Sequence, residues 1–130
     1  MKKSNFELLG HLQVMEEPLS SLYTDKLSGV MYIFVRLFEN MDDPSFVLSE
    51  VSPSTVVDYM EGKVGLTSIF QNNKAYYYRH QHDVLSTTDF KPLTREDATH
   101  RLNLDGLDDL YDKTLSHRSV PLMQYLRRFV

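Results

Sequence analysis

The sequence contains no cysteine, and this absence excludes several kinds of protein. Disulfide-stapled scaffolds, cysteine nucleophiles and thiolate zinc sites all require the missing thiol. Glycine is scarce as well: the five glycines do not cluster, so the chain has no glycine-rich phosphate-binding loop. No serine stands in a nucleophile-elbow motif. The sequence therefore shows few of the motifs that indicate a catalytic site.

Long apolar runs are also missing. No stretch approaches the roughly 20 apolar residues that a membrane span requires. Near the amino terminus, Glu7 and His11 interrupt the apolar segment that a signal peptide would need. We therefore expect a soluble, cytoplasmic protein that has no membrane partner.

The net charge of −4 is distributed unevenly along the chain. Residues 1–65 carry 10 acidic and 5 basic side chains, whereas residues 66–130 carry 8 and 9. Coating DNA non-specifically depends on many lysine and arginine contacts to phosphate, and this mildly acidic chain does not supply them. A small local site for nucleic acid is still compatible with the charge.

The length of 130 residues, with 42% hydrophobic and 25% charged residues, is typical of one globular domain. Apolar and β-branched residues predict strands near 6–15, 21–25, 30–38 and 46–51, with turn residues between them. This succession predicts an antiparallel meander. Residues 30–38 are apolar almost throughout, which favours a central position in the sheet.

The period of the pattern changes after the fourth strand. Ser52 and Pro53 predict a helix over 53–62 that Gly62 terminates, and a short helix or turn follows from Thr67. A further helix is predicted over 105–116. The chain is therefore predicted to be a single α+β domain over residues 1–130, with two or three helices packed on a mainly antiparallel sheet of four to six strands.

The segment SVPLMQYLRRFV predicts a last helix, over 120–129. Its apolar stripe is predicted at i, i+3, i+4 and i+7, which are Leu122, Tyr125, Leu126 and Phe129. Such a helix closes the domain's own core, docks in a partner's groove or builds a dimer interface.

The decapeptide KAYYYRHQHD, residues 74–83, is the most chemically loaded stretch. As a strand it would place Tyr76 and Tyr78 on one face and Tyr77 on the other. We expect the three tyrosines mainly to pack, with at least one buried against the helix at 53–62. The alternative is single-stranded nucleic-acid binding through residues 74–82, with the rings stacking on bases and Lys74 and Arg79 contacting phosphates.

His80 and His82 would project from the same face of such a strand, and imidazole is a common metal ligand. The metallo-β-lactamase pattern HxHxDH is not completed, because Asp83 comes one position too early and Val84 and Leu85 follow it. We therefore predict no metal and no cofactor. A metal-assisted hydrolase that uses the two histidines is a second alternative.

Four carboxylates recur at helical spacing in DGLDDLYD; they are Asp105, Asp108, Asp109 and Asp112. This spacing places them along one side of the helix predicted over 105–116. They lack the alternating oxygen ligands and terminal glutamate of a calcium loop. They form either a solvated face or an acidic surface for a basic partner.

The succession LYTDKLSGVMYIFV, VSPSTVVDYMEGKVGLTSIF and YYY resembles a family of small bacterial and phage domains of unknown function. The resemblance covers about residues 18–80. The positions that carry it are Gly29, Tyr32, Ile33, Gly62, Val64, Leu66 and Phe70. It implies an α+β fold and a bacterial or phage setting, and it brings no known activity.

The leading hypothesis is a non-catalytic protein-interaction module that inhibits or regulates a partner protein by occluding its surface. A homodimer is also compatible with the sequence. The residues predicted to bind are Tyr77, Arg79, His80, His82, Asp105, Asp108, Asp109 and Asp112.

Overall fold

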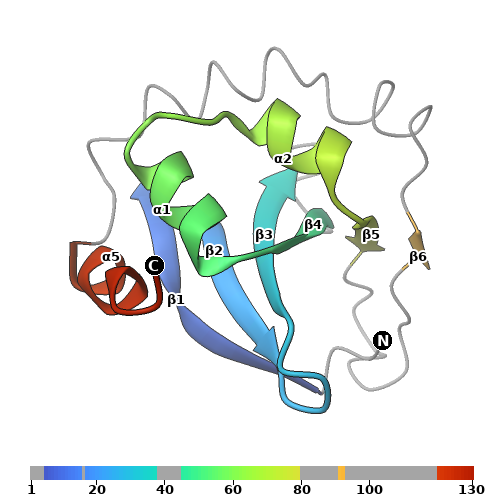
Figure 1. Cartoon of the computed structure of the whole chain (residues 1–130). Coiled ribbons are helices and arrows are strands. Elements are labelled where there is room, and N and C mark those ends of the chain that lie inside the picture. Colours follow the sequence, from blue (N-terminus) through green and yellow to red (C-terminus); the bar gives the residue numbers. More distant parts are fainter. Residues whose placement is uncertain (1–4, 16, 38–44, 80–90, 93–119) are drawn as a thin grey trace.

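The computed structural model describes residues 5–15, 17–37, 45–79, 91–92 and 120–130. They form one antiparallel sheet with three helices, which confirms the predicted α+β class (Figure 1). The strands are β1 (Phe6–Met15), β2 (Glu17–Asp25), β3 (Met31–Leu37), β4 (Ser45–Val51), β5 (Ala75–Arg79) and β6 (Lys91–Pro92). Each strand pairs with the next along the chain, so the predicted meander is confirmed.

β3 lies inside the sheet, between β2 and β4, as its composition predicts. Its side chains alternate between the two faces: Tyr32 and Phe34 point to one face, Ile33 and Val35 to the other. All four are buried. Burial on both faces is the reason why this segment is apolar at nearly every position.

The helices are α1 (Pro53–Met60), α2 (Leu66–Asn72) and α5 (Val120–Arg127). Ser52 caps α1 as predicted, because its hydroxyl accepts a hydrogen bond of 3.2 Å from the amide of Thr55. Gly62, with φ of 78°, turns the chain away after the helix. α1 and α2 lie over one face of the sheet, and α5 lies beside β1 at the sheet's edge (Figure 1).

The main core fills the space between the sheet and the helices. Leu12, Leu22 and Val47 contribute to it from the strands. α1 contributes the four positions Val56, Val57, Tyr59 and Met60 that its sequence pattern predicts. A second cluster covers the other face of the sheet, and it consists of Tyr32, Phe34 and Leu48 with the partly buried Phe6, Tyr23, Val30, Phe46 and Tyr76.

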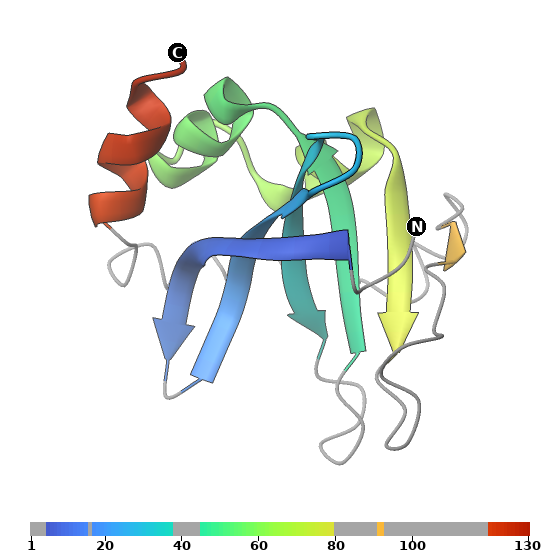
Figure 2. The same ribbon diagram turned by 90° about the horizontal axis from the view of Figure 1, so that it is seen from below.

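β1 is irregular. Its register with β2 shifts at Leu8/Gly10, at His11/Gln13 and at Gln13/Val14. Such bulges bend a strand and increase its twist, and β1 is visibly bent in Figure 2. The shifts also explain why the sequence of this segment mixes alternating and continuous apolar positions.

β5 confirms the predicted strand over its first part, from Ala75 to Arg79. Tyr76 is half-buried and belongs to the second cluster, on the face of the sheet away from α1. The three tyrosines are thus not all exposed, as predicted. Tyr76, however, does not pack against α1, where a buried tyrosine was expected. The side chains of Tyr77 and Tyr78, and the helix predicted over 105–116, lie outside the described part of the chain.

Candidate interaction surface

α5 docks with a side that only partly matches the stripe its spacing predicts: Leu122 and Leu126 are buried as predicted, but Tyr125 and Phe129 are not. Its buried residues are Leu122, Met123 and Leu126. Tyr125 is 43% exposed and Phe129 is 61% exposed, so the prediction that these two belong to the packed stripe is wrong. The physical reason is tertiary: α5 contacts both α1 and β1, and this contact selects the side that carries Met123.

An ion-pair cluster joins the end of α5 to the end of α1. Glu61 accepts a hydrogen bond of 2.9 Å from Arg127, and its other oxygen lies 2.9 Å from Nζ of Lys63. The hydrogen bond from Lys63, and then the one from Arg127, hold the pKa of the Glu61 carboxyl below its usual value. The same contact with Glu61 raises the pKa of Lys63. One carboxylate therefore serves two cations.

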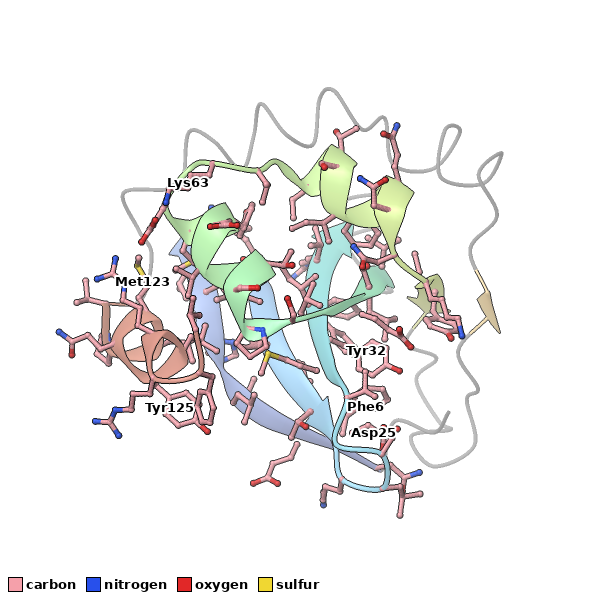
Figure 3. All side chains as sticks on the ribbon, in the orientation of Figure 1. Phe6, Asp25, Tyr32, Lys63, Met123 and Tyr125 are labelled. Atoms are coloured by element: carbon pink, nitrogen blue, oxygen red, sulfur yellow. The ribbon has the colours of Figure 1, made fainter. Side chains whose placement is uncertain are left out.

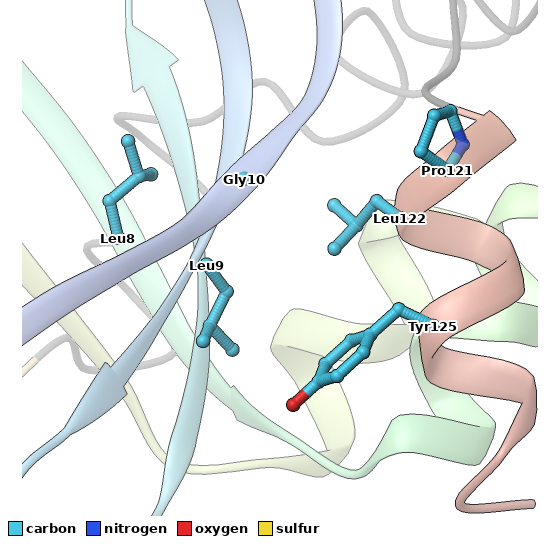
Figure 4. Close-up of a pocket in the computed structure, with 6 residues that line it drawn as sticks. All are labelled: Leu8, Leu9, Gly10, Pro121, Leu122 and Tyr125. Carbon is cyan, nitrogen blue, oxygen red and sulfur yellow. The ribbon is translucent and has the colours of Figure 1, made fainter.

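A cavity of about 350 Å³ lies between β1 and α5 (Figure 4). The residues that line it are Leu8, Leu9, Gly10, Pro121, Leu122 and Tyr125. Leu122 and Tyr125 extend from the helix toward the strand in this view. None of the six described side chains that line it is charged, so they offer mainly apolar contacts.

The exposed apolar area continues along α5 beyond the cavity. The ring of Phe129 packs edge-on against Tyr125, with 5.3 Å between ring centroids. Leu8, on the strand side, is 44% exposed. We define the β1–α5 surface as Leu8, Leu9, Gly10, Pro121, Leu122, Tyr125 and Phe129. A contiguous apolar surface of this kind on a folded domain marks an interaction site more often than scattered apolar residues do.

The second cluster is a less suitable binding surface. Phe6 and Tyr32 lie together there, away from α5 (Figure 3), with 5.3 Å between their ring centroids. Tyr32 is 3% exposed, and its hydroxyl lies 3.4 Å from a carboxylate oxygen of Glu50. Burial, and then the negative charge of Glu50, raise the pKa of Tyr32 to about 12. The phenol therefore stays protonated near neutral pH. The rings of the second cluster pack against one another, and this packing buries Tyr32.

Two polar groupings near β1 also have structural roles. Gln13 is buried, and its Oε1 accepts hydrogen bonds from Ser20 (2.9 Å) and Tyr59 (2.5 Å), which satisfies these groups inside the core. Nδ1 of His11 lies 2.7 Å from Oγ of Ser21 across the β1–β2 pair. A serine nucleophile that is activated by a histidine base also needs a third group, which orients the base. Among the described residues no acidic side chain contacts the ring of His11.

The structure does not test the eight residues predicted to bind. Tyr77 and Arg79 are in β5, in register with Val47 and Ser45, but their side chains are outside the described part. The six others, namely His80, His82, Asp105, Asp108, Asp109 and Asp112, lie in segments that the structure does not describe. Their roles stay predictions.

The described ranges contain no group of three or more histidine, aspartate or glutamate residues that could hold a metal ion. Within the same ranges, no helix has the length and hydrophobicity needed to cross a bilayer. The sequence pattern did indicate Tyr125 and Phe129 as members of the apolar stripe, but it predicted that they pack in the core and not that they are exposed. Leu8 and Gly10 gave no such signal, because their place in the cavity depends on a bulge and on a helix more than 100 positions away.

Comparison of the chain with protein families, with curated proteins and with solved structures gives no match. The resemblance to small bacterial and phage domains therefore stays a prediction.

Proposed function

We propose that this protein is a non-catalytic protein-interaction module that binds its partner with the β1–α5 surface. The observation that carries the proposal is the exposure of Tyr125 and Phe129 beside an apolar cavity. Tyrosine is enriched among the residues that dominate binding energy, since its large ring gives contact area at low cost in conformational entropy.

The helix that carries most of the β1–α5 surface is fixed to the rest of the domain. Leu122, Met123 and Leu126 anchor α5 in the main core, and Arg127 ties its last turn to Glu61. The helix therefore presents Tyr125 without having to fold on binding, which avoids part of the ordering cost of association. A partner seated here would have its own apolar surface covered, and this is how the module would inhibit or regulate it.

The experiment is site-specific photo-crosslinking in the native host. A photoreactive phenylalanine analogue replaces Tyr125 in one variant and Leu27 in a matched control. Leu27 is 80% exposed and lies in the turn between β2 and β3, outside the β1–α5 surface.

The proposal predicts a discrete crosslinked protein with the probe at Tyr125 and none with the probe at Leu27. A second variant, Leu8→Asp, should reduce the Tyr125 crosslink because Leu8 lines the same cavity. If both probe positions give the same products, or if Tyr125 gives none, the β1–α5 surface is not the binding site.

A further inference from the structure

The charges beside the β1–α5 surface indicate what kind of partner it accepts. We infer that the partner presents an amphipathic segment in which apolar side chains are flanked by carboxylates. This inference rests on the proposed function, since it concerns the ligand of the same surface. It commits to an acidic protein segment and not to a basic one or to a second copy of this chain.

The end of α5 carries two arginines, and Lys63 lies near the first of them, across Glu61. Among the described residues there, Lys63, Arg127 and Arg128 are three cations; Glu61 pairs with the first two of them, and the negative charge of Asp58 also acts on Lys63. Among the residues that the structure describes, the guanidinium of Arg128 has no ion-pair or hydrogen-bond partner, and the residue is exposed. Arg128 is therefore available to a ligand, whereas Arg127 is held in place by the fold.

Arg128 lies next to the apolar contacts of the β1–α5 surface. The backbone amide of Arg128 donates to the carbonyl of Tyr125, which places Arg128 one turn further along, directly before Phe129. A ligand that covers both rings also comes within reach of the guanidinium. A carboxylate there would form a charge-assisted hydrogen bond in a partly desolvated setting, whereas a lysine would be repelled.

The probes for the test are two short alanine-based helical peptides. Both carry leucines spaced three and four residues apart, and they differ only in having glutamates or lysines beside those leucines. Binding to the full chain is followed by NMR, through the backbone amide signals of Gly10 and Tyr125.

The glutamate peptide is expected to bind about tenfold more tightly than the lysine peptide, and the preference should shrink as salt is raised. Arg128→Glu should abolish or reverse this preference. The matched control Lys26→Glu makes the same charge change in the turn after β2, and this variant should keep the preference for the glutamate peptide.

Three results would overturn the inference: equal binding of the two peptides, a preference that survives Arg128→Glu, or binding of neither peptide. These results leave the proposed function standing if Tyr125 still crosslinks a partner in the host. Sedimentation of the chain alone decides the remaining case, because self-association that Tyr125→Asp abolishes would assign the surface to a second copy.

Discussion

Gly10 and Leu122 lie so close together that a side chain at position 10 would make a tight contact with α5. A Cβ atom built on Gly10 would be 3.1 Å from Cδ2 and 3.4 Å from Cδ1 of Leu122. With no side chain at position 10, Leu122 packs directly against the backbone of β1 at the β1–α5 surface.

Gly10→Ala should therefore destabilise the protein only modestly, by about 1 kcal/mol, the low end of the cost of overpacking, because Leu122 must shift by a few tenths of an ångström. Urea unfolding measures the change. In a Leu122→Ala background the same substitution should cost distinctly less, since the methyl groups in tight contact are gone. An equal cost in both backgrounds would show that this contact is not the cause of the destabilisation.

The docked side of α5 can be tested by truncation. Leu126 is fully buried, so Leu126→Ala should reduce the free energy of unfolding by about 2–5 kcal/mol. Phe129 is mostly exposed, and Phe129→Ala should change it by no more than about 0.5 kcal/mol. Thermal or chemical denaturation compares the two variants. A larger loss for Phe129→Ala would mean that the helix packs with the side that its spacing predicts.

The buried hydrogen bonds of Gln13 give a third prediction. Tyr59→Phe removes the hydrogen bond from Tyr59 to Oε1 of Gln13, while Ser20 still donates, so the cost should be about 0.5–1.5 kcal/mol. Gln13→Ala should cost several kcal/mol, since it opens a cavity and removes the Oε1 acceptor that Ser20 and Tyr59 share. Equal losses for the two variants, measured by urea unfolding, would contradict this account.

The link between α1 and α5 should depend on pH. The folded-state pKa of Glu61 is lowered from its ordinary value of 4.5, so its contribution to stability is complete above that pH and is lost as pH falls through the folded value. At neutral pH, Glu61→Gln should melt below the parent. The difference in Tm should disappear in acid. A Tm difference that persists in acid, or one that appears only on acidification, would contradict a lowered pKa of Glu61.

Local signals in the sequence were sufficient for most of the fold. Turn residues and alternation determined the antiparallel meander, and Ser52 with Pro53 determined where α1 begins, because these effects act over a few neighbouring residues. Burial on both faces of β3 could be predicted from its continuous apolar composition.

The candidate surface could not be predicted in the same way. The sequence of α5 has more apolar positions than one docking side can bury, so periodicity alone did not decide between Tyr125 and Met123. That choice depends on where α1 and the bulged part of β1 lie relative to the helix. The sequence by itself determined which residues are apolar; only the tertiary structure decided which of them are left exposed, because exposure depends on contacts between segments far apart in the chain.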